Sequence, residues 1–483
     1  MRAYTIKELH EMFKENPANI KAYYEDLFNE LEKQQGRLNA LVTVTKEEAM
    51  AKLEEASFDA NDMLSMIPVI YKDNFSTKGI PTTASSKILE NYVPVYNATV
   101  VDKLNARGTV IVGKSSMDEL AMGGTNKSAL TGPVANPWNT DCISGGSSGG
   151  SAALVGSGVV PFALGSDTGD SIRKPAGFCG VVGFKPTWGR ISRFGVIPYA
   201  SSLDHVGAFT RNVEDMAIVI EAMAGRDDKD MTSSLKPVEH YYENLSGDMH
   251  GQKIAVLKNV YKQITNSDVK KAFDHSLDLY REMGATVDFV SMDENLLMCA
   301  LPVYTIIANS EATSNHACLD GIKYGLRIPA ESADEVMLAS RTAGFGSHIK
   351  RRFVLGTLAL ATENQEKMFK KAQRVRRLIV EELNRIYQTY DLILTPVSNE
   401  KAPTIQEAQD NRLSSQYIIL ENNMVLGNFA GTPSLSLPIG MSDDMPFNIN
   451  IMGRLFEEQR VLNAGYALEN ALPYKNQFSG GKA

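Results

Sequence analysis

Apolar residues recur at two different spacings along the chain, and the change from one to the other outlines the fold. Between residues 5 and 57, apolar side chains such as Leu9, Met12 and Phe13 stand at helical spacing among many charged residues. Such a stripe buries only one side of a helix, so these helices are predicted to pack on a larger body. We expect residues 1–60 to form an N-terminal helical layer.

From residue 66 onward, short apolar runs alternate with amphipathic stretches. The run at 66–71 contains Pro68, which indicates a strand start or an edge strand, and it leads into Lys72-Asp73-Asn74. Further strands are predicted at 109–112, 253–257, 286–290, 391–396 and 434–438. Helices are predicted at 99–106, 268–283, 361–390 and 457–471. This βαβ rhythm predicts an α/β fold with a mostly parallel, mixed central sheet covered by helices on both faces.

The simplest organisation is one large α/β domain over residues 61–475, followed by a polar tail at 476–483 that we expect to be disordered. The N-terminus has no apolar signal core, and no window reaches about 18 uninterrupted apolar residues. We therefore expect no membrane association and a cytoplasmic location.

Composition and charge then narrow the class of protein. The 483 residues are 43% hydrophobic and 22% charged, which is enough for a large globular core. A net charge of −8 argues against a broad basic surface for nucleic acid. The four cysteines show no CxxC spacing, so they indicate reduced thiols, and no metal site is predicted.

The candidate chemistry begins with a loop at residues 144–151 that contains only serine and glycine. It matches the nucleophile-elbow pattern twice, but the last histidine, His348, lies far from the C-terminus, which disfavours a serine–histidine hydrolase. No Gly-Lys-Ser/Thr closes the run, which disfavours a phosphate-binding loop. A helix N-terminus with glycines for close packing explains this loop equally well.

A second loop follows at residues 165–173 and offers successive backbone N–H groups that suit an oxyanion. A serine at its end needs a base, and Lys72, placed after an apolar run, fits a lysine kept neutral by burial. A plainer interpretation remains open for each feature. The loop could be a simple turn in which Asp167 pairs with Arg173, and Lys72 could be a strand-end lysine in solvent. Taken alone, each plainer interpretation is the commoner outcome.

Taken together, these features resemble the amidase signature family. The resemblance is carried by residues 145–151, the spacing of Ser147 and Ser171, Lys72-Asp73-Asn74 and the segment 180–187. Motifs at 79–86, 113–123 and 190–195 make it closer to members that act as glutaminase subunits of tRNA-dependent amidotransferases. The match extends over about residues 5–470.

The resemblance implies a Ser–cis-Ser–Lys triad. Ser171 matches the nucleophile, Ser147 matches the serine that follows a non-proline cis peptide bond, and Lys72 matches the base. The proton would pass from Ser171 through Ser147 to Lys72 while Ser171 attacks the side-chain amide of glutamine. The backbone N–H groups that would hold the oxyanion belong to Thr168, Gly169, Asp170 and Ser171.

The resemblance also implies a substrate pocket. Arg352 matches an arginine that grips the α-carboxylate, and Tyr304 matches an aromatic residue of the pocket wall. Glu421 matches an acidic residue, commonly aspartate, that grips the α-ammonium, and Met122 and Gly123 are expected beside the substrate. The plainer interpretations are a solvated basic helix face for Arg352 and a core position for Tyr304.

One departure from the family lies at the nucleophile, where its usual Gly-Gly is Gly169-Asp170. Only the backbone N–H of residue 170 is required, so we expect catalysis to survive and the carboxylate to point away from the acyl carbon.

For function, the resemblance implies a glutaminase that supplies ammonia to a partner converting Glu-tRNA(Gln) to Gln-tRNA(Gln). It implies a heterotrimer with B and C subunits, and a mischarged tRNA held mainly through the partner. ATP and Mg²⁺ would be used by the partner, with no cofactor in this chain. The alternatives are a stand-alone amidase of another specificity and a catalytically inactive assembly subunit.

Overall fold

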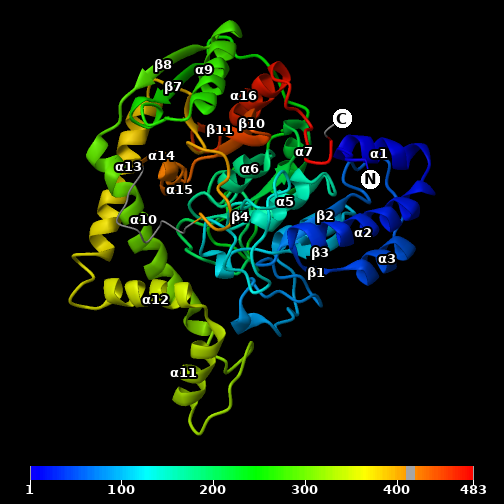
Figure 1. Cartoon of the computed structure of the whole chain (residues 1–483), viewed down its shortest axis with the longest axis vertical. Helices are drawn as coiled ribbons and strands as arrows, with labels where there is room; N and C mark the ends of the chain where they lie inside the picture. Colours follow the sequence, from blue (N-terminus) through cyan, green and yellow to red (C-terminus); the bar gives the residue numbers. More distant parts are fainter. Residues whose placement is uncertain (1, 409–418, 482–483) are drawn as a thin grey trace.

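The computed structural model describes residues 2–408 and 419–481. Its strands are β1 (Leu41–Val44), β2 (Pro68–Lys72), β3 (Val110–Ser115), β4 (Phe162–Asp167), β5 (Val182–Lys185), β6 (His205–Thr210), β7 (Lys253–Leu257), β8 (Thr286–Val290), β9 (Leu392–Pro396), β10 (Ser434–Ser442) and β11 (Met445–Gly453). Across these residues the strands form one mixed sheet in the order β1-β3-β2-β4-β6-β5-β10-β11-β9-β7-β8 (Figure 1).

Two groups of helices flank the sheet. Near its middle, the sheet packs against α5 (Gly149–Gly156) and α6 (Arg173–Cys179). A second group packs against the sheet and against one another: α4 (Thr99–Ala106), α7 (Val213–Met223), α9 (Ser267–Glu282) and α16 (Glu458–Ala471). The predicted α/β fold with a large mixed sheet covered by helices is therefore confirmed.

The remaining helices lie toward the two sides of the sheet (Figure 1). Beside β1 and β3 are α1 (Ile6–Glu15), α2 (Asn19–Leu38) and α3 (Lys46–Glu55). The other side carries α8 (Lys258–Tyr261), α10 (Glu294–Asn315), α11 (Ala333–Gly344), α12 (Ser347–Leu360), α13 (Phe369–Tyr387), α14 (Ile419–Asn422) and α15 (Val425–Ala430). Three short 3₁₀ helices complete the described set: Lys87–Leu89, Glu119–Ala121 and His316–Cys318.

The N-terminal region contains the predicted helices but also contributes a strand. Helix α1 begins at a capping box in which the Thr5 hydroxyl accepts from the Glu8 amide and the Glu8 carboxylate accepts from the Thr5 amide. Strand β1 then pairs antiparallel with β3, so the first 60 residues are part of the sheet. At the other terminus, the Ser479 amide donates to the Gly156 carbonyl at 2.9 Å, which anchors the described part of the tail.

The prediction that most of the sheet is parallel was wrong. Of the ten strand pairings among the described residues, six are antiparallel. One reason is a hairpin that the sequence interpretation missed, in which Asp443 and Asp444 both take positive φ between β10 and β11. Such a two-residue turn reverses the chain and forces antiparallel pairing, so the βαβ rhythm was not representative of the whole sheet.

Two element predictions also need correction. The helix predicted at 361–390 begins only at Phe369, because residues 361–368 form turns and offer almost no apolar side chain at helical spacing. Pro68 does begin a strand, but β2 lies between β3 and β4 and is not at an edge. Proline has no backbone N–H to donate, and it is tolerated at the first residue of a strand, where Pro68 stands.

One described segment, Glu294–Cys318, is long and apolar enough by length and composition to cross a membrane. Within the fold, 61% of its most apolar window is buried, and α10 packs against α12 and α13. These contacts are typical of a core helix.

Candidate active site

Lys72 ends β2 and is completely buried. Its Nζ lies 2.8 Å from Ser147 Oγ, 2.8 Å from Ser148 Oγ and 2.9 Å from Ser166 Oγ. Burial disfavours the ammonium form and lowers the pKa of Lys72 to about 7, although three carboxylates oppose this shift: Asp118, Asp167 and Asp204. A lysine that loses its proton near neutral pH can serve as a base, which a lysine in solvent cannot.

The loop that carries Ser147 is held from two sides. Ser147 follows a cis peptide bond from Gly146, and the Gly146 amide donates to the Gly124 carbonyl at 2.9 Å. A Cβ on either Gly123 or Gly146 would overlap the Asp118 carboxylate, which explains why glycine stands at both positions. Met122 is buried, and Met122 and Gly123 directly precede Gly124, the residue whose carbonyl contacts the cis-serine loop.

The nucleophile loop is built around a buried ion pair. Arg173 donates to both oxygens of Asp167, from Nε at 3.1 Å and from Nη2 at 3.0 Å, and both side chains are fully buried. Burial alone would raise the pKa of Asp167, but the Arg173 guanidinium outweighs it and holds that pKa well below its usual range. The plainer interpretation of this loop, a turn closed by Asp167 and Arg173, therefore describes its framework.

That framework presents the nucleophile region. Arg173 Nη2 also donates to the Gly169 carbonyl at 2.9 Å, which fixes the orientation of that peptide group. Within the described residues, the N–H groups of Gly169 and Ser171 have no intramolecular acceptor. An oxyanion hole needs such unsatisfied donors.

Ser171 is 1% exposed and lies next to the cis-serine loop, where the Ser148 amide donates to its carbonyl at 3.3 Å. Its hydroxyl makes no hydrogen bond to any residue the structure describes. The structure thus joins Lys72 to Ser147 and sets Ser171 beside them, but the last link from Ser171 Oγ to Ser147 Oγ is not formed. In unliganded active sites such a bond is commonly long and tightens with substrate.

One predicted substrate residue, Tyr304, lies against the nucleophile loop, and another, Arg352, lies on a helix that packs on the helix of Tyr304. Tyr304, on α10, is 2% exposed, and its ring lies 3.0 Å from where a Cβ on Gly169 would stand. Arg352, on the neighbouring helix α12, is 1% exposed, whereas Lys350 and Arg351 before it are exposed. A solvated basic face does not describe Arg352, because its side chain is enclosed between packed helices.

The third predicted substrate residue, Glu421, is already paired within the chain. Lys174 Nζ lies 2.9 Å from Glu421 Oε2, and the Asn399 amide donates to Oε1 at 2.8 Å. Lys174 Nζ also donates to the backbone carbonyl of Glu421 at 2.9 Å. Glu421 therefore lies against α6, where it forms an ion pair with Lys174, three residues after the nucleophile Ser171.

Sequence reasoning missed three residues of the lysine network: Ser148, Ser166 and Asn74. The Ser148 hydroxyl donates to the Ser166 carbonyl at 3.1 Å, and Asn74 Nδ2 donates to Ser166 Oγ at 3.1 Å. A signal was present, since β2 and β4 are parallel neighbours and their carboxyl ends meet at one edge of the sheet. Ser166 near the end of β4 was therefore placed to meet Lys72 at the end of β2.

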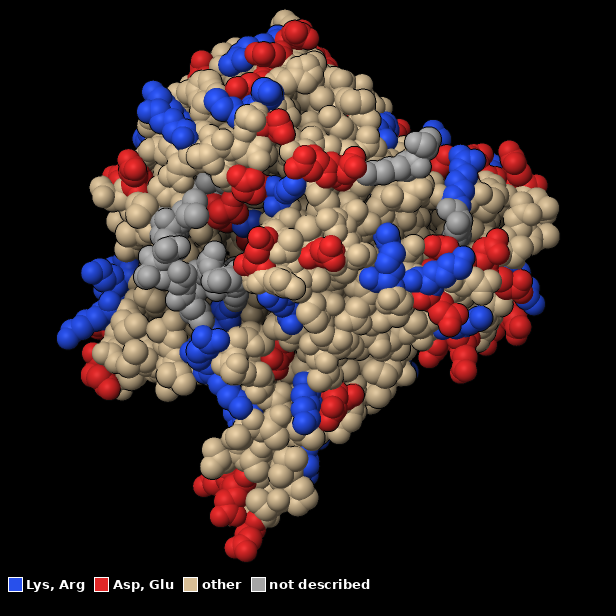
Figure 2. Space-filling view, in the orientation of Figure 1, with Lys and Arg blue, Asp and Glu red and all other residues tan. Residues whose placement is uncertain are grey.

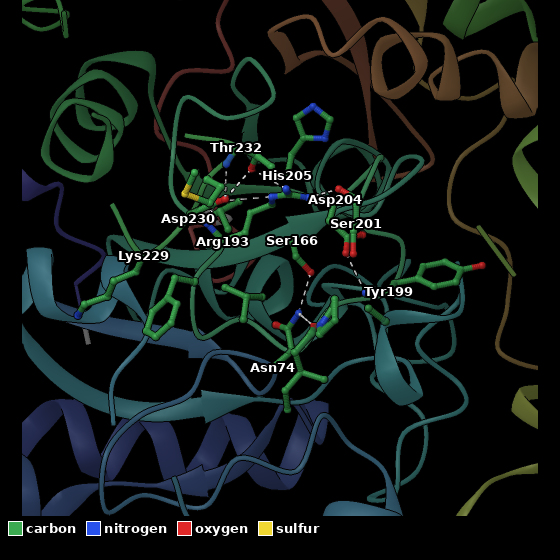
Figure 3. Close-up of a pocket in the computed structure, with 17 residues that line it drawn as sticks. Asn74, Ser166, Arg193, Tyr199, Ser201, Asp204, His205, Lys229, Asp230 and Thr232 are labelled. Atoms are coloured by element: carbon green, nitrogen blue, oxygen red, sulfur yellow. Dashed lines mark hydrogen bonds and ion pairs between the residues drawn. The ribbon is translucent and has the colours of Figure 1, made fainter. Parts of the chain in front are cut away.

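A cavity of about 330 Å³ borders this network through Asn74 and Ser166. Figure 3 shows the Asn74 side chain directed at Ser166, with Tyr199 and Asp204 on the same wall. Neither Ser147 nor Ser171 is among the described residues that line it. A second cavity of only about 10 Å³ touches the nucleophile loop at Gly169 and Asp170, so the nucleophile is enclosed.

Comparisons with known proteins agree with this arrangement. A family model described as Amidase matches residues 22–462. The chain is 39% identical to the A subunit of the glutamyl-tRNA(Gln) amidotransferase of Latilactobacillus sakei subsp. sakei over 487 residues, which cover 99% of each chain. It is 40% identical to the protein of the same name from Listeria monocytogenes serotype 4b over 480 residues, or 98% of each chain.

The fold comparison gives the same result. The crystal structure of the A subunit of the glutamyl-tRNA(Gln) amidotransferase from Thermotoga maritima superposes with a TM-score of 0.82 at 35% sequence identity. The superposition covers 98% of this chain and 96% of that one.

Proposed function

The chain belongs to the amidase family, and from that membership we propose that it is the glutaminase subunit of a tRNA-dependent amidotransferase. It hydrolyses the side-chain amide of glutamine and passes ammonia to a partner that converts Glu-tRNA(Gln) to Gln-tRNA(Gln). Relatives at 39% and 40% identity over nearly their whole length bear that subunit's name, which supports this function over a stand-alone amidase.

The observation that carries the chemistry is the hydrogen-bond arrangement around Lys72. A neutral amine has two N–H donors and one lone pair. The Ser148 hydroxyl already donates to the Ser166 carbonyl, so Ser148 Oγ must accept from Lys72. Ser166 Oγ accepts from Asn74 and can accept the second lysine N–H. The lysine lone pair is then left facing the hydroxyl proton of Ser147.

Acylation follows from this arrangement. Ser171 Oγ attacks the amide carbon of glutamine, its proton moves to Ser147 Oγ, and the Ser147 proton moves to Lys72 Nζ. The N–H groups of the nucleophile loop hold the oxyanion, and losing one such donor costs about 3 kcal/mol of barrier. The Lys72 ammonium returns its proton through Ser147 to the leaving nitrogen, so ammonia departs and a glutamyl ester remains on Ser171.

Deacylation reverses the roles. Lys72 is neutral again and, through Ser147, deprotonates a water that attacks the ester carbon. Glutamate leaves and the Ser171 hydroxyl is restored. Because Ser171 and Tyr304 are both almost fully buried, the reaction takes place shielded from bulk water.

On the substrate side, Arg352 is proposed to hold the α-carboxylate, since its planar fork matches a carboxylate and its burial strengthens the contact. Tyr304, whose ring lies against Gly169, is proposed as a wall of the pocket, and Met122 and Gly123 are proposed to border the substrate.

The partners follow from the same function. We place the chain in a cytoplasmic heterotrimer with B and C subunits, in which a partner binds ATP and Mg²⁺. On the face in Figure 2, basic and acidic side chains are interspersed, and the arm that contains α11 ends in three exposed acidic residues: Glu331, Asp334 and Glu335. This charge pattern supports a tRNA that is held mainly by the partner.

Ammonia release from glutamine by the full chain, assembled with its partner subunits, tests the proposal. We expect release that needs Ser171, and formation of Gln-tRNA(Gln) when Glu-tRNA(Gln) and ATP are added. Release from other amides but not from glutamine would instead identify a stand-alone amidase. No release from any amide by a folded, assembled chain would identify an inactive assembly subunit.

A further inference from the structure

A buried carboxylate away from the nucleophile loop links the cis-serine loop to one of the helices on the substrate side. Glu119 is 5% exposed and accepts from the Ser86 hydroxyl at 2.7 Å. Its chain neighbour contacts the cis-serine loop, because the Asp118 amide donates to the Ser147 carbonyl at 3.1 Å. The Asp118 carboxylate also fills the space beside Gly146. Glu119 therefore has a fixed position relative to the proton relay.

The Glu119 carboxylate contacts the start of helix α12. Both of its oxygens accept from the Gly346 amide, each at 3.2 Å, and His348 Nε2 lies 3.7 Å from Oε2. Gly346 is the N-cap residue of α12 and has no side chain to cap the helix. A Cβ at this position would overlap Glu119 Oε2. Glu119 thus takes the place of an N-cap side chain, and a carboxylate is favourable at the positive end of the helix dipole.

Helix α12 carries Arg352, which is proposed to hold the α-carboxylate of glutamine. Arg352 follows Gly346 by six residues, which is about 9 Å along a helix. A helix is rigid over this length, so a shift of its first turn also displaces Arg352. The contact between Glu119 and Gly346 is thus placed to set the position of the guanidinium.

We infer that Glu119 is a positioning residue, which holds Arg352 at the distance from the cis-serine loop that glutamine requires. This inference rests on the proposed glutaminase function. Glutamine must place its amide at Ser171 and its α-carboxylate at Arg352 at the same time, and a bidentate contact tolerates little misplacement. Because Glu119 acts on the helix that carries Arg352 and is not a member of the relay, it should affect substrate binding more than proton transfer.

The test measures kcat and KM for ammonia release from glutamine with the assembled full chain. We expect Glu119→Ala to raise KM roughly 10-fold and to leave kcat within about twofold, because the arginine is displaced and the relay is not. A merely structural role would lower the amount of active protein, and hence the apparent kcat, at an unchanged KM. Glu119→Gln keeps an oxygen that can accept from the Gly346 amide, so it should raise KM less than Glu119→Ala does. Glu8→Gln is the matched control and should leave KM unchanged, because Glu8 accepts from the Thr5 amide at the start of α1, which carries no proposed substrate residue.

A double-mutant comparison shows whether Glu119 acts through Arg352. In the Arg352→Lys background, Glu119→Ala should raise KM by less than about twofold. The inference is overturned if Glu119→Ala lowers kcat at an unchanged KM, or if the effects of the two substitutions on KM multiply. If Glu119→Ala does not fold, Glu119→Gln undergoes the same two measurements. An unchanged KM in Arg352→Lys would also overturn the inference, whereas wild-type protein that releases no ammonia from glutamine would refute the proposed function itself.

Discussion

Two buried lysines lie near the carboxyl ends of neighbouring parallel strands, and only one of them is placed to act as a base. Lys72 on β2 and Lys114 on β3 are both completely buried, and burial lowers their pKa values to about 7 and about 8. Lys72 faces hydroxyl groups. Lys114 Nζ instead donates to the Phe75 carbonyl at 2.8 Å and to Thr82 Oγ1 at 2.8 Å, with the Asp73 carboxylate at 3.6 Å.

A lowered pKa does not by itself identify a catalytic base, since both lysines have one. The neighbours of Lys114 hold the amine in place but cannot deliver a proton from a nucleophile. A carbonyl and a carboxylate have no proton to give, and the Thr82 hydroxyl directs its own proton at the backbone carbonyls of Phe75 and Ile80, at 3.4 and 3.3 Å. A hydroxyl both donates and accepts, so Ser147 can relay a proton from Ser171 to Lys72. The neighbours of the amine, more than its burial, distinguish a base from a structural cation.

The largest loss of activity is expected from a change at Ser171, the residue from which the proton starts. Ser171→Ala removes the nucleophile, and we expect ammonia release from glutamine to fall on the order of 10⁴-fold or more. Ammonia release by the assembled protein measures this, with Ser157→Ala as the control. Among the residues that the structure describes, the Ser157 hydroxyl bonds only to the Leu154 carbonyl at the end of its own helix. Near-normal release by Ser171→Ala would remove the nucleophile assignment and, with it, the reason to distinguish Lys72 from Lys114.

Lys72→Met should cause nearly the same loss, because members of one catalytic unit act together. Methionine fills a similar volume without a charge to desolvate, so the variant should be at least as stable as the wild type. Kinetics and thermal unfolding measured on the same sample check both expectations. A mild loss of activity would mean that another group accepts the proton.

Lys114→Met should show the opposite pattern. It leaves the Asp73 carboxylate buried without its cation, which destabilises the fold by about 3–5 kcal/mol. The folded fraction should retain ammonia release within a few-fold of the wild type. Loss of catalysis in a fully folded Lys114→Met protein would abolish the proposed contrast between the two lysines.

A second comparison is between Arg352, which is buried and proposed to bind the substrate carboxylate, and Arg351, which is exposed. Arg352→Lys should raise the KM for glutamine roughly 10- to 100-fold, because lysine cannot match the bidentate fork. Arg351→Lys, at an exposed position, is the control and should change KM less than twofold. Equal KM values for the two variants would exclude Arg352 as the carboxylate clamp.

The pH dependence should be smaller but diagnostic. Lys72 must be neutral to accept a proton, so kcat/KM should rise with pH through about 7 and fall about tenfold per unit below it. Stability should also rise with pH between about 7 and 10.5. In that window the unfolded lysine binds a proton that the folded one has lost. A profile that is flat from pH 6 to 8 would contradict a lysine base.

Much of the lysine side of the site could be predicted from the sequence, with Lys72 as the candidate base from its local pattern and the roles of Ser147 and Ser171 from the family resemblance. Lys72, Ser147 and Ser171 each lie in a short motif whose shape depends on nearby glycines, turns and strand ends. The Asp167–Arg173 pair spans six residues and was visible as an alternative for the same loop. Interactions between residues that are close in sequence can be predicted without knowledge of the tertiary fold.

The substrate side could not be predicted in the same way. Glu421 meets Lys174 across 247 residues of sequence, and no local pattern indicates that pairing. The contacts of Ser166 with Lys72 depend on strand order, and the expectation of a mostly parallel sheet failed at the same level. Helix packing decides which side chains enclose the pocket, and this is where the sequence interpretation was weakest.

The most direct test is to trap the acyl-enzyme. Assembled protein is mixed with glutamine, quenched in acid within one turnover, digested and analysed by peptide mass spectrometry. We expect a glutamyl ester on the peptide that contains Ser171, and its loss in Ser171→Ala. A glutamyl ester on any other residue, or ammonia release with no ester at all, would contradict it.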